Sequence, residues 1–392
     1  SPSCPQSPPI LLPIRARTPP DPVRYAVALS EHHDTGIALG EVVGQVLDRL
    51  GPAPDVAVLF LTGHHVDRCD ELGRTVRQTL GARHLIGGTA VSVLAHRQEV
   101  EESPAIVLWA GHTGPVEVFR PSPEGGLPDG LVDDTTVVVL ADPFSYDAVK
   151  LAGNVPPEVT LVGGLASAAG RPGGNRLFLD DEVQTGGAVA LALPPGLSAR
   201  PLVSQGCRPV GEPMTVTSSE GNLLRTLGGR PALERLKAIS EAAGPSERSL
   251  LSRGLQVGLV VDEHREVFTP GDFLVRGVLG ADRTTGAVAI GDHAPIGSTV
   301  QFQVRDADAA LAELRQMAAA WHADSALVFT CNGRGSNLFG RPGLDAEALV
   351  DGLDTTAVGG MFCAGEIGPI GGRHFLHGFT ASALLLGAEP AT

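Results

Sequence analysis

The chain has 392 residues, of which 43% are hydrophobic, and its formal net charge is −15. A chain of this length allows two to three units that each bury a core of their own. The acidic balance argues against nucleic acid or an anionic membrane as the main partner, because both require a concentrated basic surface. No uninterrupted apolar run is long enough to span a bilayer. We therefore expect a globular protein with no nucleic acid and no membrane among its partners.

The cysteines are odd in number, widely spaced and without a CxxC pair. They are Cys4, Cys69, Cys207, Cys331 and Cys363. This pattern is typical of a reducing compartment and not of a disulfide framework. No signal peptide is visible, and we expect a cytoplasmic protein.

The N-terminal segment, residues 1–22, contains eight prolines. Proline lacks a backbone donor, so such a density excludes a helix or a central strand. The segment is predicted to be a disordered, extended arm.

The chain then repeats one layout three times: an apolar strand, a helix, a second strand and a glycine pair. The predicted strands are residues 56–61 and 84–88, 136–140 and 159–164, and 326–329 and 357–360. The helices between them are predicted at 72–80, 144–151 and 345–353, and a further strand follows each unit at 105–109, 187–193 and 378–386. Such units share layered sheets because none buries its faces alone. Any α/β protein repeats strand and helix, but the recurring glycine pair favours internal duplication.

The region between the second and third units differs in character. A helix is predicted over residues 221–243, then short strands at 255–261, 272–278, 287–290 and 298–304 that form an antiparallel meander, then a helix at 309–321. We place a domain boundary near residues 214–221. The predicted fold class is α/β, with layered mixed sheets flanked by helices. Two closely packed domains, 23–215 and 216–392, follow the arm.

Two polar, glycine-lined runs follow apolar strands in the last third of the chain, at residues 330–335 and 364–372. They contain Arg334 and Glu366, and a buried charge is costly unless it is paired or used. The guanidinium group suits a carboxylate and the glutamate suits an ammonium group, so together they could hold a zwitterionic amino acid. The alternative is that the two side chains bridge each other and tie two loops together.

These residues resemble the FIST family, the sensory domain named for F-box and intracellular signal transduction proteins. The N-terminal half is similar to the FIST N region at residues 55–88 and 161–169. The C-terminal half is similar to FIST C at residues 228–232, 331–334 and 365–369, and His377 and Thr380 stand where that family shows a histidine and a small hydroxyl residue.

The resemblance implies a bacterial sensory protein of signal transduction that binds small ligands such as amino acids. The ligand site that it implies contains Arg334, Glu366, Cys331, Asn332, Gly333, Gly365, His377 and Thr380. Because the two halves fill the chain, the signal would pass to a separate partner protein.

Other classes of function stay open. Cys331 or Cys363 could act as a nucleophile with His377 or His374 as base, although no nucleophile elbow supports hydrolysis. An adaptor that works through its surface is the third class. No phosphate-binding loop matches a known fingerprint, and His65 with Cys69 supplies too few ligands for zinc. We expect no catalytic residues, no cofactor and no metal.

Overall fold

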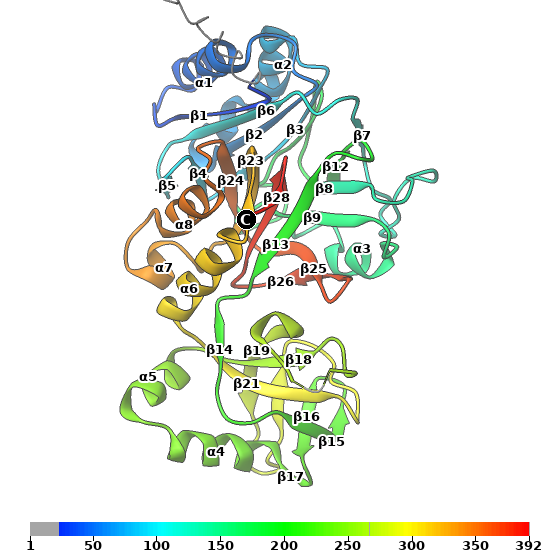
Figure 1. Cartoon of the computed structure of the whole chain (residues 1–392), viewed down its shortest axis with the longest axis vertical. Coiled ribbons are helices and arrows are strands. Elements are labelled where there is room, and N and C mark those ends of the chain that lie inside the picture. Colours follow the sequence, from blue (N-terminus) through cyan, green and yellow to red (C-terminus); the bar gives the residue numbers. More distant parts are fainter. Residues whose placement is uncertain (1–22, 266, 392) are drawn as a thin grey trace, which may run out of the picture.

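The computed structural model describes residues 23–265 and 267–391. The predicted N-terminal arm, residues 1–22, lies outside the described residues. The described chain forms a body of three six-stranded sheets and a separate β-barrel (Figure 1). The body comprises residues 23–206 and 306–391, and the barrel comprises residues 207–305. The predicted α/β class with layered mixed sheets is confirmed.

The three sheets of the body have the same build. Sheet 1 has the order β1 (Tyr25–Ser30), β6 (Ile106–Gly111), β2 (Val56–Thr62), β3 (His84–Ala90), β10 (Leu177–Leu179), β11 (Glu182–Gln184). Sheet 2 has the order β7 (Glu117–Phe119), β12 (Ala188–Ala192), β8 (Thr136–Ala141), β9 (Thr160–Leu165), β25 (Glu366–Ile370), β26 (Arg373–His377). Sheet 3 has the order β13 (Ala199–Ser204), β27 (Ala381–Leu386), β23 (Ser325–Cys331), β24 (Val358–Cys363), β4 (Ser92–Ala95), β5 (Gln98–Glu101).

The repeated layout is therefore present in the structure. In each sheet the two strands of the repeat run parallel, β2 with β3, β8 with β9 and β23 with β24. The strand that follows each repeat runs antiparallel beside the first, as β6, β12 and β27 do. The glycine pair has a steric cause in all three copies. A Cβ atom on Gly87, Gly163 or Gly360 would overlap the carbonyl oxygen of the neighbouring parallel strand.

Each sheet is completed by a hairpin from another repeat. The hairpin β4–β5 of the first repeat pairs with β24 in sheet 3. The hairpin β10–β11 of the second pairs with β3 in sheet 1. The hairpin β25–β26 of the third pairs with β9 in sheet 2. The three repeats thus exchange hairpins in a cycle, and no sheet is made by one repeat alone.

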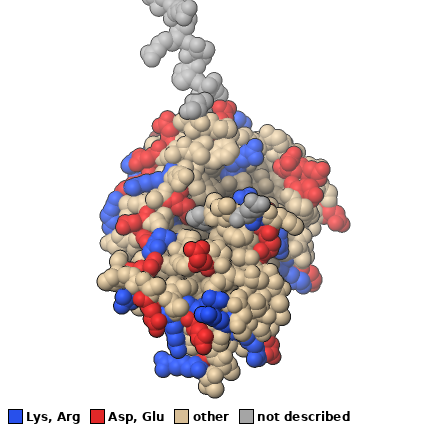
Figure 2. Space-filling model, turned by 60° about the horizontal axis from the view of Figure 1, so that its bottom comes forward, with Lys and Arg blue, Asp and Glu red and all other residues tan. Residues whose placement is uncertain are grey.

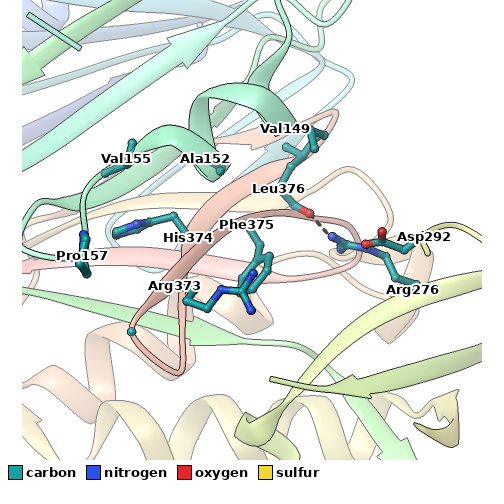
Figure 3. A pocket seen from close by; sticks show the side chains of 12 residues that line it. Val149, Ala152, Val155, Pro157, Arg276, Asp292, Arg373, His374, Phe375 and Leu376 are labelled. Carbon is teal, nitrogen blue, oxygen red and sulfur yellow. Dashed lines mark hydrogen bonds and ion pairs between the residues drawn. The ribbon is translucent and has the colours of Figure 1, made fainter. Parts of the chain in front are cut away.

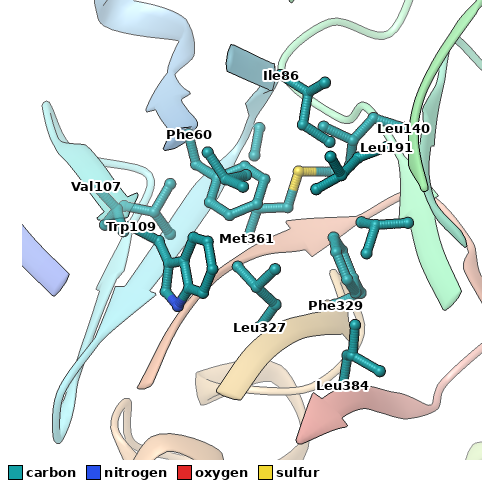
Figure 4. Close-up of a cluster of buried hydrophobic side chains, with 14 of the residues drawn as sticks. Phe60, Ile86, Val107, Trp109, Leu140, Leu191, Leu327, Phe329, Met361 and Leu384 are labelled. Carbon is teal, nitrogen blue, oxygen red and sulfur yellow. The ribbon is translucent and has the colours of Figure 1, made fainter. Parts of the chain in front are cut away.

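The main core lies where the three sheets face one another. Its members include Phe60, Trp109, Leu140, Phe329 and Met361, which come from all three sheets (Figure 4). Alternate residues of each strand point to the opposite face, where helices cover the sheet. These helices are α1 (Thr35–Leu50), η1 (Gly63–Arg68) and α2 (Cys69–Leu80) on sheet 1, α3 (Ala148–Asn154) on sheet 2, and α6 (Ala307–Ala318), α7 (Ser336–Phe339) and α8 (Leu344–Leu353) near sheet 3. A small pair, β22 (Trp321–His322) with β28 (Glu389–Pro390), lies beside them.

The barrel closes through a ring of six strands. Their order is β21 (Thr299–Arg305), β15 (Met214–Glu220), β16 (Leu223–Leu227), β20 (Val288–Ile290), β19 (Phe273–Ala281) and β18 (Leu255–Val260), which returns to β21. The short strands β14 (Cys207–Pro209) and β17 (Arg230–Pro231) pair at its side, with α4 (Ala232–Ala242), α5 (Pro245–Arg253) and η2 (Pro270–Asp272) around it. The predicted meander is confirmed for β18, β19 and β20, whereas β21 pairs back with β18.

The helix predicted over residues 221–243 is wrong in its first half. Residues 223–227 form β16, and the helix starts only at Ala232. Gly228 and Gly229 have φ values of 54° and 74°, which turn the chain after the strand and prevent a helix from continuing through them. The pairing of β13 with β27, and of β25 with β9, joins strands from both sides of residue 215. The two-domain boundary at that position stays a prediction.

Candidate functional site

The two polar runs meet at the carboxyl ends of β23 and β24. These strands are parallel neighbours, and their last residues, Cys331 and Cys363, are paired in register. Arg334 follows β23 in a tight loop, and Glu366 opens β25 after a short turn from β24. We name Cys331, Arg334, Asp345, Glu366 and Thr380 the buried cluster, because the side chains of all five are almost fully excluded from solvent.

Arg334 is fixed by a two-pronged ion pair. Its exposed fraction is 0%, and its Nε and Nη2 atoms each donate to Asp345 at 2.7 Å. Asp345 lies in the first turn of α8, is equally buried, and also accepts from Thr330 Oγ1 at 2.8 Å. Bidentate geometry is the strong form of a guanidinium–carboxylate contact, and here it aims the third nitrogen, Nη1, away from Asp345. Nη1 has no hydrogen-bond partner among the described residues.

Glu366 is buried with one oxygen satisfied. Its Oε2 accepts from the backbone N–H of Thr380 at 3.1 Å, and its Oε1 has no partner among the described residues. Burial raises the pKa of Glu366 well above its usual value, and the Thr380 N–H, the adjacent Cys331 thiol and the Arg334 charge oppose this only in part. The site therefore favours the neutral carboxylic acid until something positive approaches Oε1.

Burial shifts the pKa of the neighbouring thiols and of the His377 imidazole in the direction that favours their neutral forms. Burial, and after it the adjacent Glu366 carboxyl, raises the pKa of Cys331 to about 12, and burial also raises the pKa of Cys363. Burial lowers the pKa of His377 to about 4, and its Nε2 lies 2.9 Å from the carbonyl oxygen of Gly368. A thiolate is thus disfavoured at neutral pH.

Further unpartnered polar atoms surround the cluster. Asn332 Oδ1 and Arg305 Nε are buried without a hydrogen-bond partner in the described part of the chain. Arg305 donates from Nη2 to the Gly333 carbonyl at 2.5 Å and stacks on the Phe379 ring, with its guanidinium carbon 3.9 Å from the ring centre. An unsatisfied buried polar group costs about 1–3 kcal/mol, so several together indicate a place for a bound polar partner.

The structure brings most of the predicted site residues together. Cys331, Arg334, Glu366 and Thr380 share the buried cluster, and His377 is paired with Glu366 across the β25–β26 hairpin. The alternative of a bridge between Arg334 and Glu366 is wrong, since the ion pair of Arg334 is with Asp345. Gly365 packs between Leu165 and Leu376, and a Cβ on Gly333 would lie 2.8 Å from the Phe379 ring. The ligand-binding role of all eight residues stays a prediction.

Three contributors to this site were missed by sequence reasoning. Asp345 lies in a helix whose apolar pattern indicated only packing. Gly206 and Arg305 lie at the two places where the chain crosses between body and barrel. Gly206 has a φ of 67°, and a Cβ there would lie 2.6 Å from Arg334 Nη1. One feature of the sequence could have indicated Asp345. It is an acidic side chain in the first turn of an otherwise apolar helix, a position where a carboxylate is favourable.

No group of three or more His, Cys, Asp or Glu side chains within residues 23–265 and 267–391 is placed to hold a metal ion. In the same ranges, no helix combines the length and the apolar character needed to cross a membrane.

Comparison with known proteins identifies the same family that the sequence motifs resemble. The FIST N domain model matches residues 55–230, and the FIST C domain model matches residues 232–369. An uncharacterized protein of Mycobacterium bovis is 42% identical over 381 residues, which cover 93% of this chain and 98% of the relative. An uncharacterized protein of Mycobacterium tuberculosis is 42% identical over 381 residues, with 93% and 99% covered. The chain therefore belongs to the FIST family and carries both its N and its C domain.

Proposed function

We propose that this protein is a small-ligand sensor and that its buried cluster binds an amino acid or a similar zwitterionic metabolite. FIST domains are associated with sensory roles in signal transduction. The observation that carries the proposal is a pair of buried, unpartnered atoms of opposite character, Arg334 Nη1 and Glu366 Oε1.

The chemistry of these two atoms matches the two ends of an amino acid. Nη1 donates to the α-carboxylate of the ligand while Nε and Nη2 stay with Asp345. Oε1 accepts from the ammonium group while Oε2 stays with the Thr380 N–H. Asn332, with its free Oδ1, and Cys331 form the wall beside them.

Binding of an ammonium group requires the ionised form of Glu366. Since burial raises the pKa of this carboxyl, the ligand displaces a proton when it binds. We expect affinity to rise with pH until the pKa of the free protein's Glu366 is passed, and to level off above it.

The signal is proposed to be a shift between arrangements of body and barrel. Both chain crossings touch the site, Gly206 at Arg334 and Arg305 at Gly333. A ligand that binds one arrangement more tightly increases its population. A separate cytoplasmic partner protein then recognises that arrangement. The face in Figure 2, where basic side chains are interspersed with acidic ones, favours a protein partner over nucleic acid.

The test is a thermal-shift and calorimetry screen with the twenty amino acids. A ligand that binds only the folded protein raises its melting temperature by mass action. We expect at least one amino acid to do so, and Glu366→Gln to weaken it at least tenfold because the amide lacks the charge. Glu241→Gln is the matched control, since Glu241 is exposed on α4.

Two results would contradict the proposal. One is a screen in which no amino acid or related zwitterion raises the melting temperature. The other is an affinity that is the same in Glu366→Gln and in the wild type. The structure gives little support to the alternative of a cysteine-dependent enzyme, because the pKa of the Cys331 thiol is raised to about 12.

A further inference from the structure

A hollow lies at the junction of body and barrel, and none of the residues that line it belongs to the buried cluster. It has a volume of about 420 Å³, within the range of small-molecule sites. Helix α3 forms one wall with Val149 and Ala152, and the strand β26 forms another with Arg373 and His374. The barrel contributes Arg276 from β19 and the nearby Asp292 (Figure 3).

Two guanidinium groups from different parts of the fold line this hollow. Arg276 donates from Nε to Asp292 at 2.7 Å and from Nη1 to the Leu376 carbonyl at 3.0 Å. Its Nη2 makes no hydrogen bond within the described part of the chain. Arg373 lies over the Phe375 ring, 5.3 Å from its centre, and forms no ion pair with any described residue. The hollow therefore carries one net positive charge in a protein whose net charge is −15.

His374 gives the second, independent indication of a ligand. Its exposed fraction is only 7%, and its imidazole hydrogen-bonds to no described residue although its nitrogens are not fully shielded from solvent. Burial lowers its pKa, so the ring is neutral at neutral pH and offers one donor and one acceptor. The ring nitrogens are not enclosed by the protein, so they are open to a molecule bound in the hollow.

The rest of the lining is apolar. Val149 is 62% exposed although it is a large hydrophobic residue, and Leu376 and Phe375 also line the hollow, from opposite faces of β26 (Figure 3). The carboxylate of Asp292 is already held by Arg276, so no free anion remains to attract an ammonium group. The hollow thus differs in chemistry from the buried cluster, which contains both a donor and an acid.

We propose that this hollow binds a small organic anion, a carboxylate on an apolar body, between Arg276 of the barrel and Arg373 of the body. The carboxylate accepts from the two guanidinium groups, the apolar body packs on Phe375, which shares the β26 face of Arg373, and His374 lines the α3 side of the same hollow. Because one arginine belongs to the barrel and one to the body, the anion stabilises the arrangement in which the two are close. This inference does not depend on the amino-acid site.

The experiment uses the full chain with benzoate, acetate and inorganic phosphate as probes at constant ionic strength. Binding is followed by calorimetry and by the NMR signals of the His374 ring, assigned through their loss in His374→Gln. We expect benzoate to bind at least tenfold more tightly than acetate, because acetate lacks the apolar body. The His374 signals should shift and saturate with benzoate.

The variant Arg373→Gln should weaken benzoate binding at least tenfold and leave the fold intact, since Arg373 holds no ion pair. Arg283→Gln is the matched control, because Arg283 is an exposed, unpaired arginine of the barrel. Glu366→Gln should bind benzoate as the wild type does, which separates this site from the buried cluster. Equal binding of benzoate and acetate, tighter binding of phosphate, unmoved His374 signals or full affinity in Arg373→Gln would each overturn the proposal.

Discussion

Some glycines of this protein lie so close to a neighbouring strand that no side chain fits at their positions. Gly360 illustrates this, since it lies on β24 directly beside Val328 of the parallel strand β23. A Cβ at this position would overlap the Val328 carbonyl oxygen, and neither strand can move because both are buried in sheet 3.

We expect Gly360→Ala to lower the free energy of unfolding by about 3 kcal/mol or more, as overpacking against backbone does. Gly40→Ala is the control, because Gly40 lies in α1 with nothing within 4 Å of its Cβ position. That change should stabilise the protein by about 0.5–1 kcal/mol through helix propensity. Urea denaturation of both variants measures the difference. A Gly360→Ala protein as stable as the wild type would contradict the steric account.

The sequence located Arg334 and Glu366 well but not their partners. Their positions after buried strands predicted burial, and both have an exposed fraction of 0%. The partner of Arg334 is Asp345, and this choice depends on how α8 docks against β23, which no local pattern encodes. Gly206 and Arg305 come from distant segments for the same reason.

Among the elements, α8 begins in an unusual way. Its Ncap residue is Gly343, which has no side chain to cap the helix, and Glu99 from β5 does this instead. Glu99 accepts from the backbone N–H groups of Gly343, Asp345 and Ala346 at 2.7–3.1 Å. Burial and the nearby Asp345 nevertheless raise the pKa of Glu99 to about 7, from 4.5, because the three hydrogen bonds offset only part of the desolvation.

This raised pKa makes the contribution of Glu99 to stability depend on pH. Between pH 4.5 and 7 the unfolded chain has lost this proton while the folded chain keeps it. The contribution therefore falls as pH rises through that window, by about 3 kcal/mol in total, and is constant above it. The glutamine does not titrate, so its free energy of unfolding should not fall in this way. Between pH 5 and 6.5 we expect the free energy of unfolding of Glu99→Gln to rise relative to that of the wild type by about 1.4 kcal/mol per pH unit.

Urea denaturation at several pH values from 5 to 8 measures this difference. Glu241→Gln serves as the control, because Glu241 is exposed on α4. Parallel pH profiles for Glu99→Gln and the wild type would show that Glu99 is already ionised throughout the range.

Elements with a strong local pattern were predicted well from the sequence. The helices at 72–80 and 345–353 were found because their apolar residues recur at helical spacing, and the structure has α2 and α8 there. The helix predicted from residue 221 failed because β16 also contains leucines that satisfy this spacing. These residues form a strand because they pair with β15 and β20, and such pairing cannot be recognised in a short apolar run.

At the scale of the whole molecule, body and barrel are joined by two chain crossings, at residues 205–207 and 305–307. The first contains Gly206, which packs on the fixed guanidinium group of Arg334. Since Asp345 holds Arg334 from the other side, the arginine cannot yield to an added methyl group.

We expect Gly206→Ala to destabilise the protein by about 2–3 kcal/mol, from both the positive φ and the clash. Gly196→Ala provides the comparison, because Gly196 has a φ of 83° but nothing within 4 Å of its Cβ position. The free energy of unfolding of Gly196→Ala should fall by only about 1 kcal/mol, because backbone strain is its sole cost. The two unfolding free energies, measured side by side, isolate the contact with Arg334. Equal losses would mean that Arg334 moves freely.

The sequence indicated three copies of one layout but not how the copies combine. The exchange of hairpins is invisible locally, because β4, β10 and β25 read as ordinary short strands. Only the assembled register shows that each completes a sheet of another copy.

This exchange has a consequence for the chain while it is being synthesised. The hairpin β4–β5 leaves the ribosome when more than half of the chain, with its partner β24, is still to be made. Until then its edge is open to pairing with other nascent chains, a known route to aggregation. The open edge belongs to β4, and Glu99 and Glu101 lie on β5, which pairs with the other side of β4, so their negative charges lie one strand from that edge and repel other chains. Glu99, which caps α8 in the folded protein, thus also helps to protect the incomplete sheet from pairing with other chains during synthesis.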